Sequence, residues 1–463
     1  MGCSGPLSHY AGVERSLLVG QPEQAIQMMQ SAKDDYGNKS RLLFLMDYGM
    51  VLHLAGRYAE SNVVLEEANL LIEDFYTTRI RDTAAALLVN EAQQPYEGTP
   101  YEHVMVNVVK ALNYAFLQQW SEALVEGRRI DHRLNVLSDT VEENNTYHED
   151  PFARYLIGLL YDIAGDLNNA YVGYRKAEQV YEDEQAWIRV PLPDVLKSDL
   201  IRTANRLGLY EDVERYQEKY PEVAAQPILR KYPHRSEIVV IDYHGQGPQK
   251  EELVIDVPVS LDALRLVALT KPGFRRSGRA ARGGEALLYG IHGRIARIAL
   301  PRFTIPKTSL TLDRIQFQNE KTTINIQTQL MYDVHAVAEK TLADDYDSLV
   351  LRAVARAAMK MGAAEGIALG ARAAAGKHNR DWIGPLVGGL ARIFALATEE
   401  ADIRTWRTLP GEIQLTRLWV EPGEYTMTIQ SGDFHGQDAQ ASQDTRLHLQ
   451  ENETRFLFHQ SLP

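Results

Sequence analysis

The chain has 463 residues, of which 45% are hydrophobic and 24% charged, with one cysteine and a formal net charge of −13. Such a composition is ordinary for a globular protein of two or three domains, and a single cysteine excludes an internal disulfide and a zinc cluster of thiolates. The charge is uneven: residues up to Arg235 include 23 basic and 35 acidic side chains, against 26 and 27 beyond it. An N-terminal half this acidic argues against nucleic-acid binding there.

The first five residues, Met-Gly-Cys-Ser-Gly, set Cys3 between small residues. This resembles the cut end of a bacterial lipobox, where a signal peptidase cleaves before the cysteine that carries the lipid. We therefore expect lipidation at Cys3 and a short tether over residues 1–10. Two alternatives stay open, an incidental cysteine and a dual-acylation start, although Pro6 occupies the position where myristoylation requires Ser or Thr.

Residues 11–230 contain a repeated sequence pattern. Each copy has a turn residue, an apolar residue two positions later and a small residue five positions later. The turn residues are Gly20, Gly56, Gln118, Gly165 and, more weakly, Gly208. The pattern resembles the turn and second helix of a tetratricopeptide repeat. In such a repeat, Gly ends the first helix in a left-handed cap, and small residues let the two helices pack closely. Leu65 and Tyr174 are expected to fill the gap between the helices. We predict an array of helical hairpins, with a generic helical bundle as the alternative.

Arrays of this kind curve and present a concave face. Polar or amphipathic residues on the predicted helices are candidates to line it and bind a protein partner, although each alone also fits a solvated surface. The candidates are Asn107, Asn113, Tyr114, Arg128, Arg129 and Arg154. The nearby His148-Glu149-Asp150 is interpreted as a helix start rather than a metal site, because acidic residues favour helix N-termini.

Residues 236–463 change to alternating patterns that predict antiparallel strands with one buried face. The predicted strands cover 237–243, 252–257, 309–318, 323–329, 413–420, 425–429, 446–449 and 455–458. An Ala/Gly-rich helical hairpin is expected to interrupt them at about 344–400, starting at the acidic residues 344–347. A membrane-inserted hairpin is the alternative, which its many Arg and Lys residues disfavour. The predicted fold class is α+β, with an all-α hairpin array followed by an antiparallel β-rich domain.

An Arg-rich, Gly-rich segment covers residues 275–302. Its arginines are Arg275, Arg276, Arg279, Arg282, Arg294, Arg297 and Arg302. Guanidinium groups on a Gly-rich loop can clamp phosphate or carboxylate, so an anionic lipid or a glycan is the expected ligand of this segment. A disordered, solvated loop is the alternative.

The sequence lacks a phosphate-binding Gly-x-x-x-x-Gly-Lys-Ser/Thr loop, a His-Glu-x-x-His motif and a Gly-x-Ser-x-Gly elbow. The thirteen histidines are scattered, and the acidic cluster at 344–347 lacks the Gly and Glu of a calcium loop. We therefore expect no catalytic residue, no cofactor and no metal site.

Several strings of the sequence are distinctive, namely 96–98 with 102–107, 111–114, 126–129, 150–155 with 165–171, and 401–406 with 409–410. They resemble a poorly characterised family of bacterial tetratricopeptide-repeat envelope lipoproteins. The resemblance covers most of the chain. It implies a non-enzymatic scaffold, anchored by lipid to the periplasmic face of the outer membrane, that binds protein partners of a cell-envelope assembly in its repeat groove. The β-rich half would bind a second partner.

Overall fold

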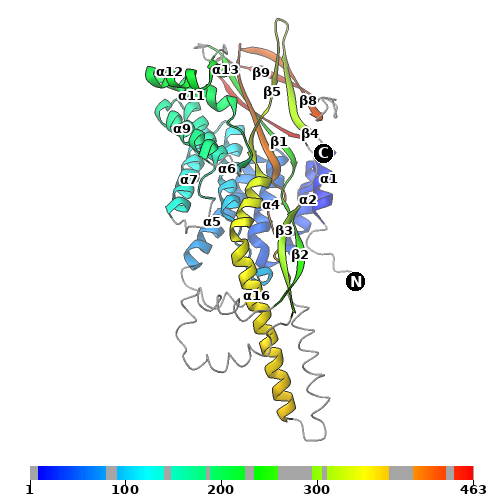
Figure 1. Ribbon diagram of the computed structural model, residues 1–463. Coiled ribbons are helices and arrows are strands. Elements are labelled where there is room, and N and C mark those ends of the chain that lie inside the picture. Colours follow the sequence, from blue (N-terminus) through cyan, green and yellow to red (C-terminus); the bar gives the residue numbers. More distant parts are fainter. Residues whose placement is uncertain are drawn as a thin grey trace.

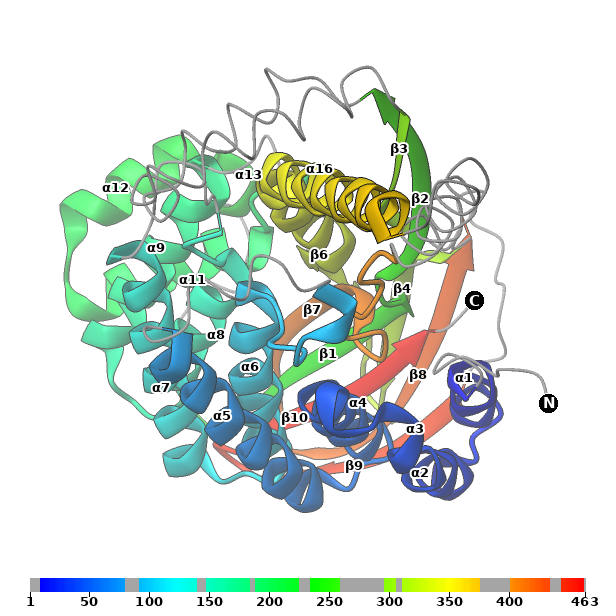
Figure 2. The ribbon, with the colours of Figure 1, turned by 90° about the horizontal axis from the view of Figure 1, so that it is seen from below.

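The computed structural model describes residues 9–79, 91–139, 147–183, 188–224, 234–258, 295–304, 310–374, 400–433 and 443–461. Helices form the first half of the chain, and strands with one long helix form the second (Figure 1). Viewed along the long axis, the helices follow one another in an arc around the strands (Figure 2). This confirms the predicted α+β class.

Helices that pair in antiparallel hairpins make up the described part of the array. They are α1 (Tyr10–Leu18) with α2 (Pro22–Ser31), α4 (Arg41–Leu54) with α5 (Tyr58–Arg79), α6 (Pro100–Phe116) with α7 (Trp120–Asp139), α8 (Pro151–Ile163) with α9 (Leu167–Asp183), and α11 (Asp194–Leu207) with α12 (Tyr210–Lys219). Short helices connect or extend them: α3 (Lys33–Tyr36), η1 (Asn38–Ser40), η3 (Glu91–Gln93) and α13 (Pro221–Ala224).

The five predicted turn residues all take the left-handed conformation between paired helices. The φ angles are +69° at Gly20, +74° at Gly56, +83° at Gly165, +74° at Gly208 and +58° at Gln118. A residue with positive φ stops the first helix and turns the chain back, which is inexpensive for Gly and strained for Gln. The hairpin positions were therefore predictable from local sequence.

Close helix contact at small residues is also confirmed. A methyl group added to Gly49 would lie 2.5 Å from Leu65 Cδ2, and one added to Gly158 would lie 2.7 Å from Tyr174 Cδ1. The side chains of Leu65 and Tyr174 therefore fill the space that these glycines leave. Asp150 caps α8 by accepting a 2.8 Å hydrogen bond from the backbone N–H of Ala153, so the helix start predicted there is confirmed.

The strands form two four-stranded sheets and one hairpin. They are β1 (Ser236–Gln246), β2 (Gln249–Pro258), β3 (Ile295–Thr304), β4 (Leu310–Gln318), β5 (Thr323–Gln327), β6 (Gln329–Asp333), β7 (Pro410–Val420), β8 (Gly423–Asp433), β9 (Gln443–Leu449) and β10 (Thr454–Ser461). The inner sheet has the order β10-β1-β7-β6, the outer sheet β5-β4-β8-β9, and β2 pairs with β3. β1 and β10 run parallel, unlike the predicted antiparallel arrangement, because the chain crosses between sheets after β9.

The inner sheet is buried on both faces. Val239, Ile241 and Tyr243 of β1 join the core of the helical array. Ile238 and Val240, which alternate with them, join the core between the two sheets. A strand covered on both sides reads as a continuous apolar run, as the Ile-Val-Val-Ile sequence of β1 does. One hydrophobic core therefore extends from the helices into the sheet.

The helix of the second half, α16 (Val334–Ala374), begins earlier than the predicted start at Asp344. Asp333 Oδ1 accepts a 2.9 Å hydrogen bond from the N–H of Ala336 and so caps the true first turn, whereas Asp344 pairs with Lys340 within the helix. The second arm of the predicted hairpin lies outside the described residues. None of the described helices is long and apolar enough to cross a bilayer.

Gly158→Ala should lower the free energy of unfolding by about 1–3 kcal/mol, because the new methyl group would overlap the ring of Tyr174. Gly127→Ala in α7 is the matched control: its nearest neighbour, Leu160 Cδ1, would lie 3.6 Å away, so the gain in helix propensity should leave stability equal or higher. Thermal or chemical denaturation measures both. Equal effects of the two substitutions would contradict the packing described.

Candidate functional site

Helices α4, α6 and α9 contact the inner sheet, so the concave side of the array is covered there by the chain's own strands. The ring of His53 in α4 lies 5.6 Å from that of Tyr243 in β1, and Phe116 in α6 lies 5.9 Å from Phe458 in β10. Tyr181 in α9 donates a 2.7 Å hydrogen bond to the carbonyl of Met331 in β6. In this structure the concave face is a packing surface.

A buried ion-pair network joins the same two parts. Arg417 of β7 donates 2.8 Å contacts to Asp162 at the end of α8 and to Asp199 of α11, and it pairs with Glu237 of β1. Arg202 of α11 pairs with both aspartates. Burial alone would raise the pKa of Asp162, but the two guanidinium groups hold it well below its usual range.

Residues 404–408, which precede β7, contact α4, α6 and the segment before α6. Trp406 donates its backbone N–H to Glu102 Oε1 at 2.8 Å, and the hydroxyl of Thr408 donates to Asp47 Oδ1 at 2.9 Å. Arg404 donates to the backbone carbonyl of Gln94 at 3.1 Å. Burial raises the pKa of Asp47 to about 6, although hydrogen bonds from Tyr10, Thr408 and Tyr36 oppose the rise. Residues 401–406, noted above for their family resemblance, thus serve internal packing.

Three of the six candidate partner-binding residues are buried. Asn107 donates to Glu126 at 2.9 Å, Asn113 donates to Ser61 at 2.9 Å, and Arg154 pairs with Glu149 at 2.6 Å. Their polar atoms therefore make contacts inside the chain. A role for them in binding a partner stays a prediction.

The other three candidates reach solvent. Tyr114 is half-buried, Arg128 is exposed, and the exposed Arg129 pairs with Glu66 of α5 at 2.8 Å.

Tyr114 also lines a groove, which we call the outer groove. The groove has a volume of about 470 Å³ and lies between α5 and the turn from α6 to α7. Its lining residues are Ala59, Asn62, Val63, Glu66, Glu67, Leu70, Tyr114, Leu117 and Gln119. Val63 is 65% exposed and Leu70, one helical heptad later, 59% exposed, so an apolar stripe of α5 faces solvent.

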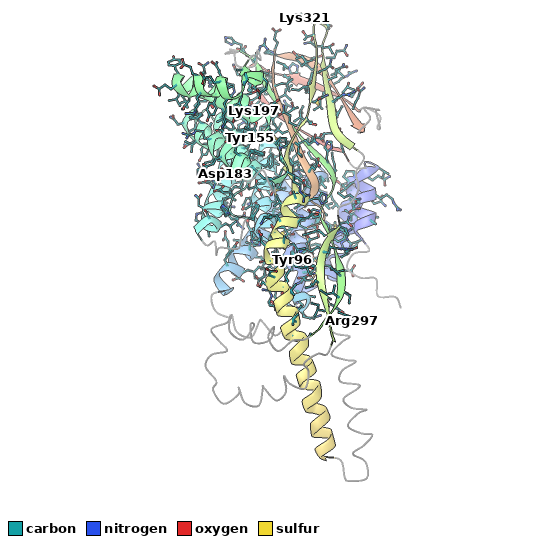
Figure 3. The ribbon with its side chains drawn as sticks, in the orientation of Figure 1. Tyr96, Tyr155, Asp183, Lys197, Arg297 and Lys321 are labelled. Atoms are coloured by element: carbon teal, nitrogen blue, oxygen red, sulfur yellow. The ribbon has the colours of Figure 1, made fainter. Side chains whose placement is uncertain are left out.

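A larger cleft of about 900 Å³ lies between the start of α11 and strands β4, β5 and β7. Lys197, labelled in Figure 3, lines it together with Arg314, Gln316 and Asn325. Arg417 also lines it and is held by the ion pairs described above. The lining offers hydrogen-bond donors and acceptors from both halves of the chain.

Most of the Arg-rich segment, including Arg275, Arg276, Arg279, Arg282 and Arg294, lies outside the described residues, as does Cys3. Its last part is a strand rather than a loop. Arg297 and Arg302 lie on β3 and pair with Asp256, at 3.0 Å, and Glu251 of β2. Lys321 marks the tip of the β4–β5 hairpin at the top of the molecule, whereas Arg297 lies far below it, beside α16 (Figure 3). Anion binding by this segment stays a prediction.

Sequence reasoning missed a group of acidic and imidazole side chains between the two sheets. Asp242 and His244 of β1, Asp313 of β4 and His459 of β10 come together there. Burial raises the pKa of Asp242 to about 6. Burial would also raise the pKa of Asp313, but hydrogen bonds, above all the one with His459, outweigh burial and lower this pKa. The one local signal was an Asp on a predicted strand and a His two positions later, just past the predicted end; in extended backbone two such residues lie on one face.

No protein-family model matches this chain, and no curated protein matches it significantly. Solved structures with a similar fold include MamA from Desulfovibrio magneticus RS-1, at 18% identity over 48% of this chain and 95% of that one, with a TM-score of 0.30. PilW, described as a widely conserved type IV pilus biogenesis factor, has 16% identity over 48% and 80%, with a TM-score of 0.30. The apo form of RapI has 12% identity over 48% and 55%, with a TM-score of 0.35. In each case the match involves about half of this chain.

The contact of His53 with the sheet should make stability depend on pH. Burial lowers the pKa of His53 from 6.5 to about 4, so the unfolded chain binds more protons between these values. Acidification through this window should therefore remove up to about 3 kcal/mol of stability. The variant His53→Gln should lose this part of the pH dependence, measured as unfolding free energy from pH 7 to pH 4. Parallel pH profiles for the two proteins would contradict the assignment.

Proposed function

We propose that the protein is a non-enzymatic, lipid-anchored scaffold of the bacterial cell envelope, and that it binds a protein partner in the outer groove. The supporting observation is the apolar stripe of Val63 and Leu70, which stays exposed although the inner side of the same array is covered. Apolar side chains that line an exposed groove are typical of protein-binding sites.

The proposed binding surface differs from the concave face expected from the sequence. A partner in the concave face would have to displace the inner sheet from contacts such as those of His53 with Tyr243 and Phe458. A partner in the outer groove displaces only water. Tyr114 belongs to the groove lining and Arg129 contacts Glu66 at its edge, so two of the residues proposed from the sequence remain part of the site.

Charge defines the kind of partner. Glu66 and Glu67 line the groove, and Glu60 and Glu73 lie exposed on the same helix. An amphipathic helix with apolar residues on one face and Lys or Arg beside them would complement both the stripe and its acidic border. Such a segment is the ligand that we propose.

The anchor belongs to the proposal as well. Lipidation at Cys3, as the lipobox resemblance implies, would hold the scaffold on the periplasmic face of the outer membrane. Bacterial lipoproteins carry several acyl chains, and more than one chain is needed for stable attachment. Attachment to one surface raises the effective concentration of a bound partner there.

Val63→Lys combined with Leu70→Lys should abolish capture of the partner, because it removes both apolar contacts and adds charge of the same sign as the partner. Two buried aliphatic contacts correspond to about 3–6 kcal/mol, so affinity should fall at least 100-fold. Both side chains are exposed, so the fold should be unaffected. The measurement is affinity capture from solubilised envelopes with the lipidated protein as bait, quantified by mass spectrometry.

The matched control is Val172→Lys on α9, which changes a 51% exposed valine outside the groove. It should capture the partner as the unmodified protein does. A partner lost equally from both variants, or from neither, would refute the outer groove as its binding site.

Cys3→Ser in the full-length protein should move the protein from the membrane fraction to the soluble fraction after cell disruption. The reason is that the serine hydroxyl cannot accept the thioether-linked lipid. Immunoblots of separated fractions, with the unchanged protein alongside, provide the measurement. Retention of the variant in the membrane would disprove the anchor while leaving the outer groove untouched.

A further inference from the structure

The side chains between the two sheets are apolar at one end of the sheets and polar at the other. The apolar end has Ile238 and Val240 of β1 facing Phe317 of β4. At the other end, the same face of β1 carries Asp242 and His244, and the same face of β4 carries Asp313. The parallel register of β1 and β10 places His459 beside Asp242 and Ser461 beside His244. Side chains from three strands thus converge on one buried point.

The atoms that could bind a cation lie close together. One ligand atom from each of Asp242, His244 and Asp313 falls within 4.8 Å of the others. His244 Nε2 lies 2.7 Å from Asp242 Oδ2 and 3.7 Å from Asp313 Oδ2, and His459 Nε2 lies 3.3 Å from Asp313 Oδ2. Tetrahedral zinc with ligands at about 2.0–2.2 Å places neighbouring ligand atoms about 3.4 Å apart. Shifts below about 1 Å would bring the measured contacts to that spacing.

Some atoms of the group have no hydrogen-bond partner among the described residues. They are Asp242 Oδ1, Asp313 Oδ1 and His244 Nδ1. All three side chains are at most 1% exposed. Buried carboxylate oxygens are normally paired with a donor or a cation, so two such oxygens in one pocket indicate a missing positive partner.

We propose that Asp242, His244 and Asp313 bind a divalent first-row metal ion, with Zn²⁺ as the best fit, and that His459, which lies beside Asp313, moves in as the fourth ligand. Two carboxylates and two neutral imidazoles are a donor set that zinc accepts, and the ion would neutralise both buried carboxylates. Four protein ligands leave no open position, which makes the site structural rather than catalytic. The ion would tie β1 and β10 of the inner sheet to β4 of the outer sheet. The side chain of His459, 26% exposed, offers the route of entry.

The test is metal binding by the full chain. After removal of metals with a chelator and dialysis, the protein should take up one equivalent of Zn²⁺, measured by calorimetry and elemental analysis, and its melting temperature should rise. The cobalt-loaded protein should show the strong visible absorption of a tetrahedral site. X-ray absorption of the zinc-loaded protein should show nitrogen and oxygen ligands with two imidazoles.

Asp313→Asn and His459→Gln should each weaken Zn²⁺ binding at least tenfold, whereas His448→Gln, which changes an exposed histidine of β9, should bind as the unmodified chain does. The cobalt spectrum of the unmodified protein decides the question independently if a variant fails to fold. Absence of uptake of Zn²⁺, Co²⁺, Mn²⁺ and Ni²⁺ by the unmodified protein would overturn the proposal, and would leave the four side chains as a network that shares protons. Equal binding by all three variants would also overturn it.

Discussion

One buried guanidinium group holds the two halves of the chain together. The side chain of Arg417, in β7, pairs with carboxylates from two helices of the array and from the neighbouring strand β1. Removal of one partner from such a buried group leaves the opposite charge without compensation, which typically destabilises a protein by about 3–5 kcal/mol. The network therefore fixes how the sheet sits against α8 and α11. The aromatic contacts of α4 and α6 with β1 and β10 depend on the same placement.

This arrangement also explains much of the uneven charge. Asp47, Glu102, Asp162 and Asp199 contribute to the acidic excess of the first half, yet they are buried and contact residues 404–417 of the second half. Part of the acidic character is thus internal complementarity between two halves of one chain.

Local signals in the sequence predicted the elements better than their contacts. The turn glycines, the cap at Asp150 and the alternating strands depend on neighbouring residues, and these predictions are confirmed. Strand β3 was missed because its arginines suggested an anion clamp, while Ile298 and Leu300, which lie on the face opposite Arg297, pack against α16. The start of α16 was misplaced because Asp333 is the last residue of β6, so that no loop separates the strand from the helix.

The candidate sites were less predictable, because they depend on residues far apart in the chain. Nothing local indicates that the inner sheet covers the concave face, since the helices carry the same apolar pattern whether strands or a separate protein cover them. Asp242, Asp313 and His459 each occupy one position of an ordinary alternating strand, and only the pairing of β1 with β10 and the stacking of the sheets bring them together.

The parallel pairing of β1 with β10 has a kinetic consequence. β1 lies at the centre of the inner sheet, but its neighbour β10 follows more than two hundred residues later in the chain. Helical hairpins can form as soon as their own residues are available, whereas this sheet has to wait for residues 454–461. Until then, the concave side of the array and one edge of β1 stay uncovered. A nascent chain therefore passes through a stage that exposes apolar helix surface and an open strand edge, and this stage is where a chaperone would be needed.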